Sequence, residues 1–168
     1  MKSLRGKAGF TLIEVCIVLA IIGLLLVGVI KGEQLLKNAK VKKQLKQIEQ
    51  VKSAVVAYQD MKKGVWPGDA AKDGQVDASP AALDALKAEK LIVGSTGQKI
   101  TNAFGGTLDI VYDATAVANV IEITAMPDEA MEAIDELSDD GVATTGDILY
   151  YAAAAGPPAV VARLIIKL

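Results

Sequence analysis

Residues 10–30 read FTLIEVCIVLAIIGLLLVGVI, and the rest of the chain is organised around this apolar stretch. A helix rises about 1.5 Å per residue, so these 21 residues extend roughly 31 Å, enough to cross the hydrocarbon core of a bilayer. One carboxylate, Glu14, lies within the stretch. Because an ionisable group inside a membrane helix is costly, we expect Glu14 to have a function beyond packing.

A short basic segment precedes the apolar stretch. Residues 1–9 read MKSLRGKAG, and positive charges before an apolar helix favour a cytoplasmic location for that end. A secretory signal peptide has the same order of charged and apolar residues. The apolar stretch is longer than a signal peptide requires, and no A-x-A cleavage motif follows it, so the sequence favours a membrane helix.

Residues 31–63 continue the helix with an amphipathic pattern. No proline occurs between residues 10 and 65, so the pattern predicts a single helix of about 54 residues. Apolar side chains recur at intervals of three and four residues, which is the spacing of one helix face. The residues on this predicted buried face are Val41, Leu45, Ile48, Val51, Val55 and Tyr58.

Charge is divided unevenly along the chain. Residues 31–63 carry nine lysines and three acidic residues, whereas residues 64–168 carry six basic and sixteen acidic residues. A basic segment followed by an acidic one indicates electrostatic packing between copies of the chain, and makes nucleic-acid binding a weaker interpretation.

The residue types of the chain also limit its chemistry. There is no histidine, and Cys16, the single cysteine, lies in the apolar stretch. Residues 64–168 therefore contain no disulfide and no thiolate or imidazole metal site. We find no nucleophile–base pair and no phosphate-binding loop, so the sequence predicts that the protein is not an enzyme.

Residues 64–168 form a head that begins with turn and helix signals. Residues 64–68 read GVWPG, which is typical of a turn that ends a helix. Ser79 and Pro80 suit the N-cap and the first position of a short helix. The predicted buried face of this helix consists of Leu83, Leu86 and Leu91.

The remainder of the head carries strand signals and one more helix. The predicted strands are residues 108–112 (LDIVY), 120–124 (VIEIT), 147–153 and 159–167. A helix is expected over residues 128–137, with inward-facing Met131, Ile134 and Leu137. We therefore expect an α+β fold in which the C-terminal half of the long helix covers one face of a four-stranded antiparallel sheet.

Two acidic loops in the head are candidates for calcium binding, because Ca²⁺ prefers oxygen ligands. The first contains Asp69, Asp73 and Asp77, and the second is flanked by residues 139, 140 and 147, all aspartates. Neither loop has the spacing of an EF-hand. The alternative interpretation is that these aspartates form turns through local hydrogen bonds, and on that reading the protein has no cofactor.

The sequence GFTLIE at residues 9–14, after a basic leader and before an apolar helix, resembles the processing signature of type IV pilins and type II secretion pseudopilins. Shorter similarities to pilin heads are WPGD (residues 66–69), NAFGG (residues 102–106) and IDELSDDG (residues 134–141). The resemblance implies the pilin fold, with a cleaved leader (residues 1–9), a transmembrane assembly helix (10–30), an amphipathic stalk helix (31–63) and a globular head (64–168).

The resemblance also implies roles for individual residues. A prepilin peptidase would cleave after Gly9, and the new N-terminal Phe10 would be N-methylated. The Glu14 carboxylate would pair with the terminal amine of a neighbouring subunit and so set the register of assembly. Lys31 stands where many pilins have a helix-breaking proline, so any melting of the helix is expected at Gly28 and Gly32.

The partners implied by the resemblance are other copies of the chain in a filament, the prepilin peptidase and N-methyltransferase, and an inner-membrane assembly platform with its ATPase. The precursor would be a single-pass protein of the bacterial inner membrane, and the mature subunit, most simply a major pilin, would reach the cell surface. Within the family, the alternatives are a minor pilin and a periplasmic type II secretion pseudopilin. Outside it, the alternative is a membrane-tethered binding or adhesion module that does not polymerise.

Overall fold

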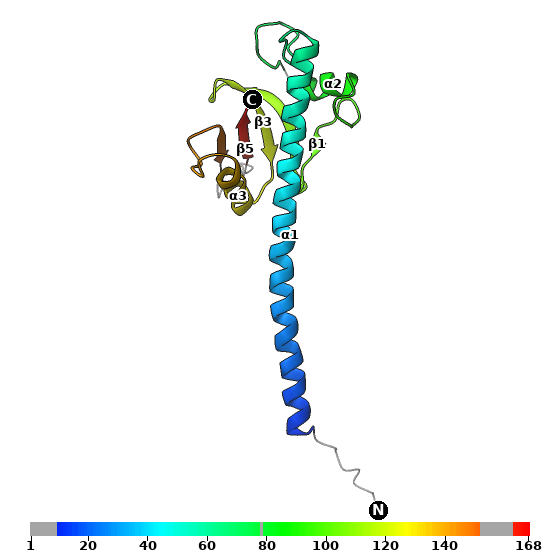
Figure 1. Cartoon of the computed structure of the whole chain (residues 1–168), viewed down its shortest axis with the longest axis vertical. Coiled ribbons are helices and arrows are strands. Elements are labelled where there is room, and N and C mark those ends of the chain that lie inside the picture. The colour runs from blue at the N-terminus through cyan, green and yellow to red at the C-terminus, as the bar shows by residue number, and fades with distance from the viewer. Residues whose placement is uncertain (1–9, 78, 152–162) are drawn as a thin grey trace, which may run out of the picture. The chain divides into compact units, whose positions relative to one another are not determined.

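The structure is a computed structural model that describes residues 10–77, 79–151 and 163–168. Its elements in chain order (Figure 1) are α1 (Leu12–Met61), α2 (Ala81–Ala88), β1 (Ile100–Thr101), β2 (Thr107–Asp113), β3 (Ala118–Thr124), α3 (Asp128–Ser138), β4 (Ile148–Tyr151) and β5 (Arg163–Lys167). The chain divides into two compact units, Met1–Asn38 and Ala39–Leu168, so the boundary between them falls within α1.

Helix α1 contains 50 residues, which confirms the prediction of one long helix. It ends at the predicted turn, where Gly64 has a φ of 87° and its amide donates to the carbonyl oxygen of Gln59 at 2.7 Å. Glycine adopts this left-handed conformation without the steric penalty of a side chain, so it terminates the helix at low cost.

The second unit contains an antiparallel sheet of five strands in the order β1-β2-β3-β5-β4. The predicted hairpin is confirmed as β2 and β3, in which Leu108 lies opposite Ile123 and Asp113 lies opposite Ala118. The later predicted strands correspond to β4 and β5, and their predicted parts at residues 152–153 and 159–162 lie outside the described residues. The predicted α+β class is therefore correct.

The strand count differs from the prediction because β1 adds a fifth strand of only two residues. A turn built around Asn102 brings β1 back onto β2. The Asn102 Oδ1 atom accepts hydrogen bonds from the amides of Phe104 (2.8 Å) and Gly106 (2.9 Å), and its Nδ2 donates to the carbonyl of Thr124 at 2.6 Å. A two-residue strand has no alternating pattern, so its pairing depends on this side chain and not on a sequence period.

The C-terminal part of α1 covers one face of the sheet (Figure 1) and supplies its predicted face to the core. The buried members of that face are Val41, Ile48, Val51 and Val55, and the half-buried ones are Leu45 and Tyr58. Helix α2 contributes the fully buried Leu83 and Leu86, and the half-buried Leu91 follows it. The periodicity therefore predicted the α1 contribution to the core correctly.

Two details of the predicted helices are wrong. Ser79 does not cap α2, because Pro80 occupies the N-cap position and the Ser79 hydroxyl donates instead to the carboxylate of Asp109. Leu137 does not point inward, since 66% of its surface is exposed. It lies six residues beyond the buried Met131, which at about 100° per residue places it roughly 120° away from the inward face.

Candidate functional site

The start of α1 is held by a reciprocal pair of side chains, Thr11 and Glu14. The Thr11 hydroxyl accepts a hydrogen bond from the Glu14 amide at 3.3 Å, and the Glu14 Oε2 atom accepts from the Thr11 amide at 3.2 Å. The Thr11 hydroxyl also lies 3.2 Å from the same Oε2 atom. This arrangement is a capping box, which satisfies amides that the first helical turn leaves without partners.

The capping box gives Glu14 a local role that the sequence-based interpretation did not include. Its signal was present, because Thr-x-x-Glu before an apolar run is the sequence pattern of a capping box. The Glu14 carboxylate also lies in the first turn of α1, where a negative charge interacts favourably with the helix dipole. Phe10, the predicted methylation site, is exposed next to this cap, and Gly9 lies outside the described residues.

The apolar part of α1 is unburied within the chain. Within the described residues, α1 is the one helix long and apolar enough to cross a membrane, with a mean hydropathy of 3.0 over its most apolar window and no burial of that window. Apolar side chains remain exposed from Leu12 to Ile30 and again at Leu35 and Leu36. Such a surface requires lipid or the helices of other molecules to cover it.

Gly28 and Gly32, the predicted positions of helix melting, lie within the continuous helix. A Cβ atom added at either position would meet nothing within 4 Å. Packing within the chain therefore does not explain why these two positions lack side chains.

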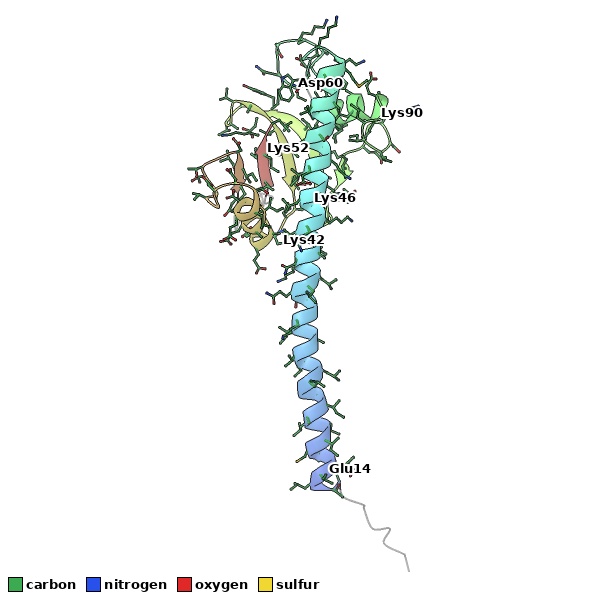
Figure 2. All side chains as sticks on the ribbon, viewed as in Figure 1. Glu14, Lys42, Lys46, Lys52, Asp60 and Lys90 are labelled. Atoms are coloured by element: carbon green, nitrogen blue, oxygen red, sulfur yellow. The ribbon has the colours of Figure 1, made fainter. Side chains whose placement is uncertain are left out.

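Several lysines lie on the second-unit part of α1 (Figure 2). Lys62 pairs with Glu89 at 2.5 Å, and this hydrogen-bonded carboxylate raises the pKa of Lys62. Lys40 lies 6.0 Å from the centre of the Phe104 ring. Lys42 and Lys46 are exposed, and neither makes an ion pair with a described residue. Lys42 and Lys46 therefore contribute exposed positive charge to the predicted basic segment.

The first predicted calcium loop is closed by its own hydrogen bonds. Asp69 is buried, and its two oxygens accept from the amides of Asp73 (3.2 Å) and Gly74 (3.0 Å). Asp77 accepts from the Ala70 amide at 2.6 Å. The three candidates Asp69, Asp73 and Asp77 are not among the described carboxylates that converge on one point.

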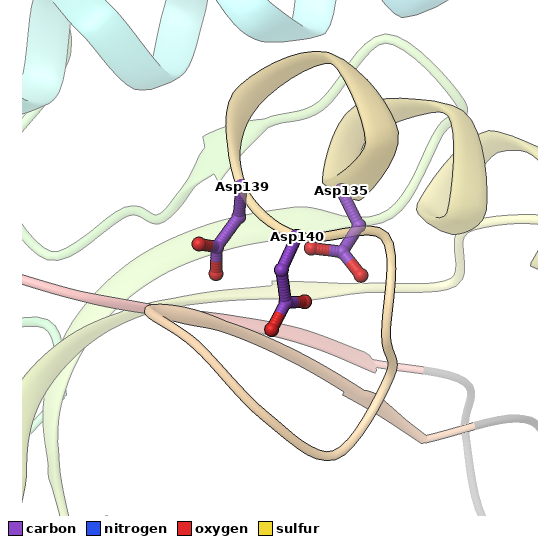
Figure 3. Close-up of side chains that lie close together, drawn as sticks. All are labelled: Asp135, Asp139 and Asp140. Atoms are coloured by element: carbon purple, nitrogen blue, oxygen red, sulfur yellow. The ribbon is translucent and has the colours of Figure 1, made fainter.

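A group of three carboxylates does converge at the end of α3 (Figure 3). One oxygen from each of Asp135, Asp139 and Asp140 lies within 4.8 Å of the others. Asp135 is fully buried, and neither of its carboxylate oxygens has a hydrogen-bond partner. Burial raises the pKa of Asp135, and the charges of Asp140 and Asp139 raise it further. The Gly141 amide acts in the opposite direction and lowers the pKa of Asp135.

The other two carboxylates are oriented by the loop that follows α3. Asp139 Oδ2 accepts from the amides of Asp147 (2.5 Å) and Ile148 (2.8 Å). Asp140 accepts from the Thr145 hydroxyl at 2.6 Å and from the Val142 amide at 2.8 Å, and these bonds lower the pKa of Asp140. The sequence identified the loop aspartates but missed Asp135, which lies one helical turn before Asp139.

Comparison with known proteins identifies the N-terminal part of the chain. A family model described as the prokaryotic N-terminal methylation motif matches residues 4–30. No curated protein and no solved structure matches the chain. The motif implies processing by a prepilin peptidase and handling by pilus assembly machinery, and together with the long apolar helix it fits a precursor anchored in the inner membrane. The chain carries the prepilin signature of the type IV pilins and pseudopilins.

Proposed function

We propose that the protein is a structural subunit, a major type IV pilin, which is cleaved after Gly9, methylated at Phe10 and polymerised into a helical extracellular filament. The observation that carries this proposal is the unburied apolar part of α1 directly after the methylation motif. The same surface suits lipid before assembly and the helices of neighbouring subunits after it. The free-energy change of transfer between these two apolar environments is small. An assembly ATPase would therefore supply the energy for extraction from the membrane.

In this proposal, Glu14 exchanges one partner for another. Within the chain it caps α1 through Thr11. Cleavage creates a positively charged amine at Phe10, and in a filament core both this amine and the Glu14 carboxylate lose their water. An isolated charge in an apolar environment is costly, and pairing between neighbouring subunits removes both penalties. The pairing also sets the axial position of each subunit.

The absence of close contacts around Gly28 and Gly32 supports the proposal. Each glycine costs up to about 1 kcal/mol relative to alanine within a helix. Because no packing within the chain requires them, we infer that they allow the helix to unwind between neighbouring subunits. A density map of the filament with regular helix from Leu24 to Leu35 would contradict this role.

The test uses the full precursor, expressed with a prepilin peptidase and a pilus assembly system. Electron microscopy of sheared surface material should show filaments, and the mass of the recovered subunit should correspond to a chain that begins at methylated Phe10. Glu14→Gln should abolish filaments while the precursor still accumulates in the membrane. The matched control is Glu33→Gln, which removes an acid from the same helix and should leave filaments intact.

Other outcomes would support the alternatives. Cleavage without surface filaments, with the mature subunit retained in the periplasm, would indicate a type II secretion pseudopilin. Filaments that persist without the gene product, but change in number, would indicate a minor pilin. A membrane-tethered adhesion module would keep its function in the Glu14→Gln variant. We also propose that the protein is not an enzyme, since the sequence contains no histidine to act as a base near neutral pH and its single cysteine lies in the apolar stretch.

A further inference from the structure

Asp135 is the most anomalous polar side chain of the second unit. It lies on the inward face of α3 beside Ile134, with no exposed surface and no hydrogen bond to either oxygen. A buried carboxylate normally has a hydrogen-bond partner or a counter-charge, because burial without one is costly. A buried carboxylate with two such oxygens is a candidate ligand for a cation.

No lysine or arginine whose side chain is described donates a hydrogen bond to Asp135. No lysine or arginine occurs between residues 100 and 162. Lys167, which follows in β5, donates to the carbonyl of Gly146 and not to the carboxylates. Two neighbouring residues instead add negative charge, since Asp139 and Asp140 each place an oxygen within 4.8 Å of an Asp135 oxygen. Three carboxylates this close repel one another unless a positive charge lies among them.

The loop after α3 holds the other two carboxylates in place around this position. Asp139 accepts two hydrogen bonds from loop amides through its Oδ2 atom. Asp140 accepts one hydrogen bond at each of its two oxygens, from the Val142 amide and the Thr145 hydroxyl. Gly146 has a φ of 76°, and a Cβ atom there would collide with the Asp139 carboxylate. The loop backbone therefore fits closely around Asp139, and Figure 3 shows the three side chains gathered beside the end of α3.

We propose that Asp135, Asp139 and Asp140 bind one Ca²⁺ ion, which ties the end of α3 to the loop before β4. The ligand atoms are all carboxylate oxygens, the chemistry of hard divalent cations, and the chain has no histidine to favour zinc. Ca²⁺ binds oxygens at about 2.3–2.6 Å, so ligands on opposite sides of the ion are about 5 Å apart, which suits this cluster. Mg²⁺ requires shorter bonds and a stricter octahedron, and is expected to bind less tightly.

The experiment measures thermal unfolding of the full chain in detergent micelles, after chelation and then with increasing CaCl₂. A ligand that binds the folded state alone raises the Tm with concentration, so the Tm of the wild-type protein should rise with Ca²⁺. Calorimetric titration should give one ion per chain. At equal concentration, Mg²⁺ should give the smaller rise. A wild-type Tm that does not respond to Ca²⁺ would overturn the proposal.

Three variants assign the effect to the site. Asp135→Asn preserves the side-chain size and should abolish the Ca²⁺-dependent rise in Tm. Asp140→Asn changes an exposed residue, so it should fold normally and bind Ca²⁺ at least about tenfold more weakly, as expected for the loss of one charged ligand. The control is Asp73→Asn in the other acidic loop, which should respond like the wild type. A full response in Asp135→Asn, or loss of the response in Asp73→Asn, would contradict the assignment.

The cation site and the proposed filament function fail independently. The site lies in the second unit, whereas the filament proposal depends on the apolar part of α1. Loss of filaments in Glu14→Gln would leave the Ca²⁺ response unchanged. Absence of a Ca²⁺ response would leave processing and polymerisation unaffected in the wild-type protein.

Discussion

The two parts of α1 differ in the exposure of their apolar side chains. In the first unit, up to Asn38, the large apolar side chains from Leu12 to Ile30 are all exposed. In the second unit, the apolar side chains at Val41, Ile48, Val51 and Val55 are buried, while lysines occupy the outer surface. One continuous helix thus consists of a part that the chain itself covers and a part that another molecule must cover.

This difference separates stability from assembly. Substitutions on the buried face of the second-unit part should change the free energy of unfolding, because they act on the core beneath the sheet. Substitutions in the first-unit part should change membrane insertion and polymerisation while the second unit remains folded. The following variants test that separation, from the largest expected effect to the smallest.

Val55→Asp should produce the largest effect. Val55 is 1% exposed, so the variant places an unpaired carboxylate in the core. We expect a loss of about 4 kcal/mol or more in the free energy of unfolding, measured by circular dichroism during denaturation. The neighbouring Val56 is exposed, so Val56→Asp is the matched control and should change stability by less than about 0.5 kcal/mol. Similar losses in both variants would show that the two faces of this segment are not distinct.

Leu24→Asp, in the first unit, should reduce membrane insertion without changing the stability of the second unit. An aspartate at the centre of a membrane helix disfavours insertion by about 3 kcal/mol relative to leucine. We expect less precursor in the membrane fraction after flotation, with an unchanged Tm for the second unit in detergent. The control is Leu24→Ile, which keeps an apolar side chain and should insert like the wild type. A Tm that falls in Leu24→Asp would mean that the apolar part of α1 stabilises the second unit directly.

Thr11→Ala should destabilise only the first turn of α1. Loss of an N-cap costs about 1 kcal/mol, and here it also removes the hydroxyl bonded to Glu14. Amide exchange should become faster over residues 12–15, while the amides of the sheet are unaffected. Thr11→Ser retains the hydroxyl and should preserve the slow exchange. Equal exchange in all three proteins would show that the capping box does not stabilise the helix start.

Asp84 should give a smaller effect that is confined to acid pH. The amide of Gly97 donates to both Asp84 oxygens at 2.8–2.9 Å, and together with Lys87 it lowers the pKa of Asp84. The charged form stabilises the folded state above the ordinary pKa, and this contribution is lost as the pH falls through the lower folded-state value. In Asp84→Asn, stability should depend less steeply on pH in that acid range. A pH dependence identical to that of the wild type would contradict this.

Much of the architecture follows from local patterns. The absence of proline and the three- and four-residue spacing predicted α1 and its buried face, including Val41 and Ile48, since a helix repeats within a few residues. The hairpin of β2 and β3 followed from two β-rich runs joined by a short loop. The helix cap at Thr11 and Glu14 was also readable, because it depends on residues three positions apart.

Two of the errors concern contacts between distant residues. Ser79 has the right residue type for a cap, but its hydroxyl bonds to Asp109, thirty residues away. The strand β1 depends on the bond between Asn102 and Thr124, and no periodic pattern marks it. The error at Leu137 is local: this residue was assigned inward by its three-residue spacing from Ile134, whereas the rotation of α3 places Asp135 on that face.

By itself, the sequence determined the N-terminal processing motif, the long helix and the division of that helix into an apolar and an amphipathic part. Each of these depends on residues that are neighbours along one helix, so composition and spacing are sufficient. Only the tertiary structure decided that Asp135 is buried without a partner beside Asp139 and Asp140. That outcome depends on how α3 packs against the sheet and how the following loop folds back, and neither is a local property of the chain.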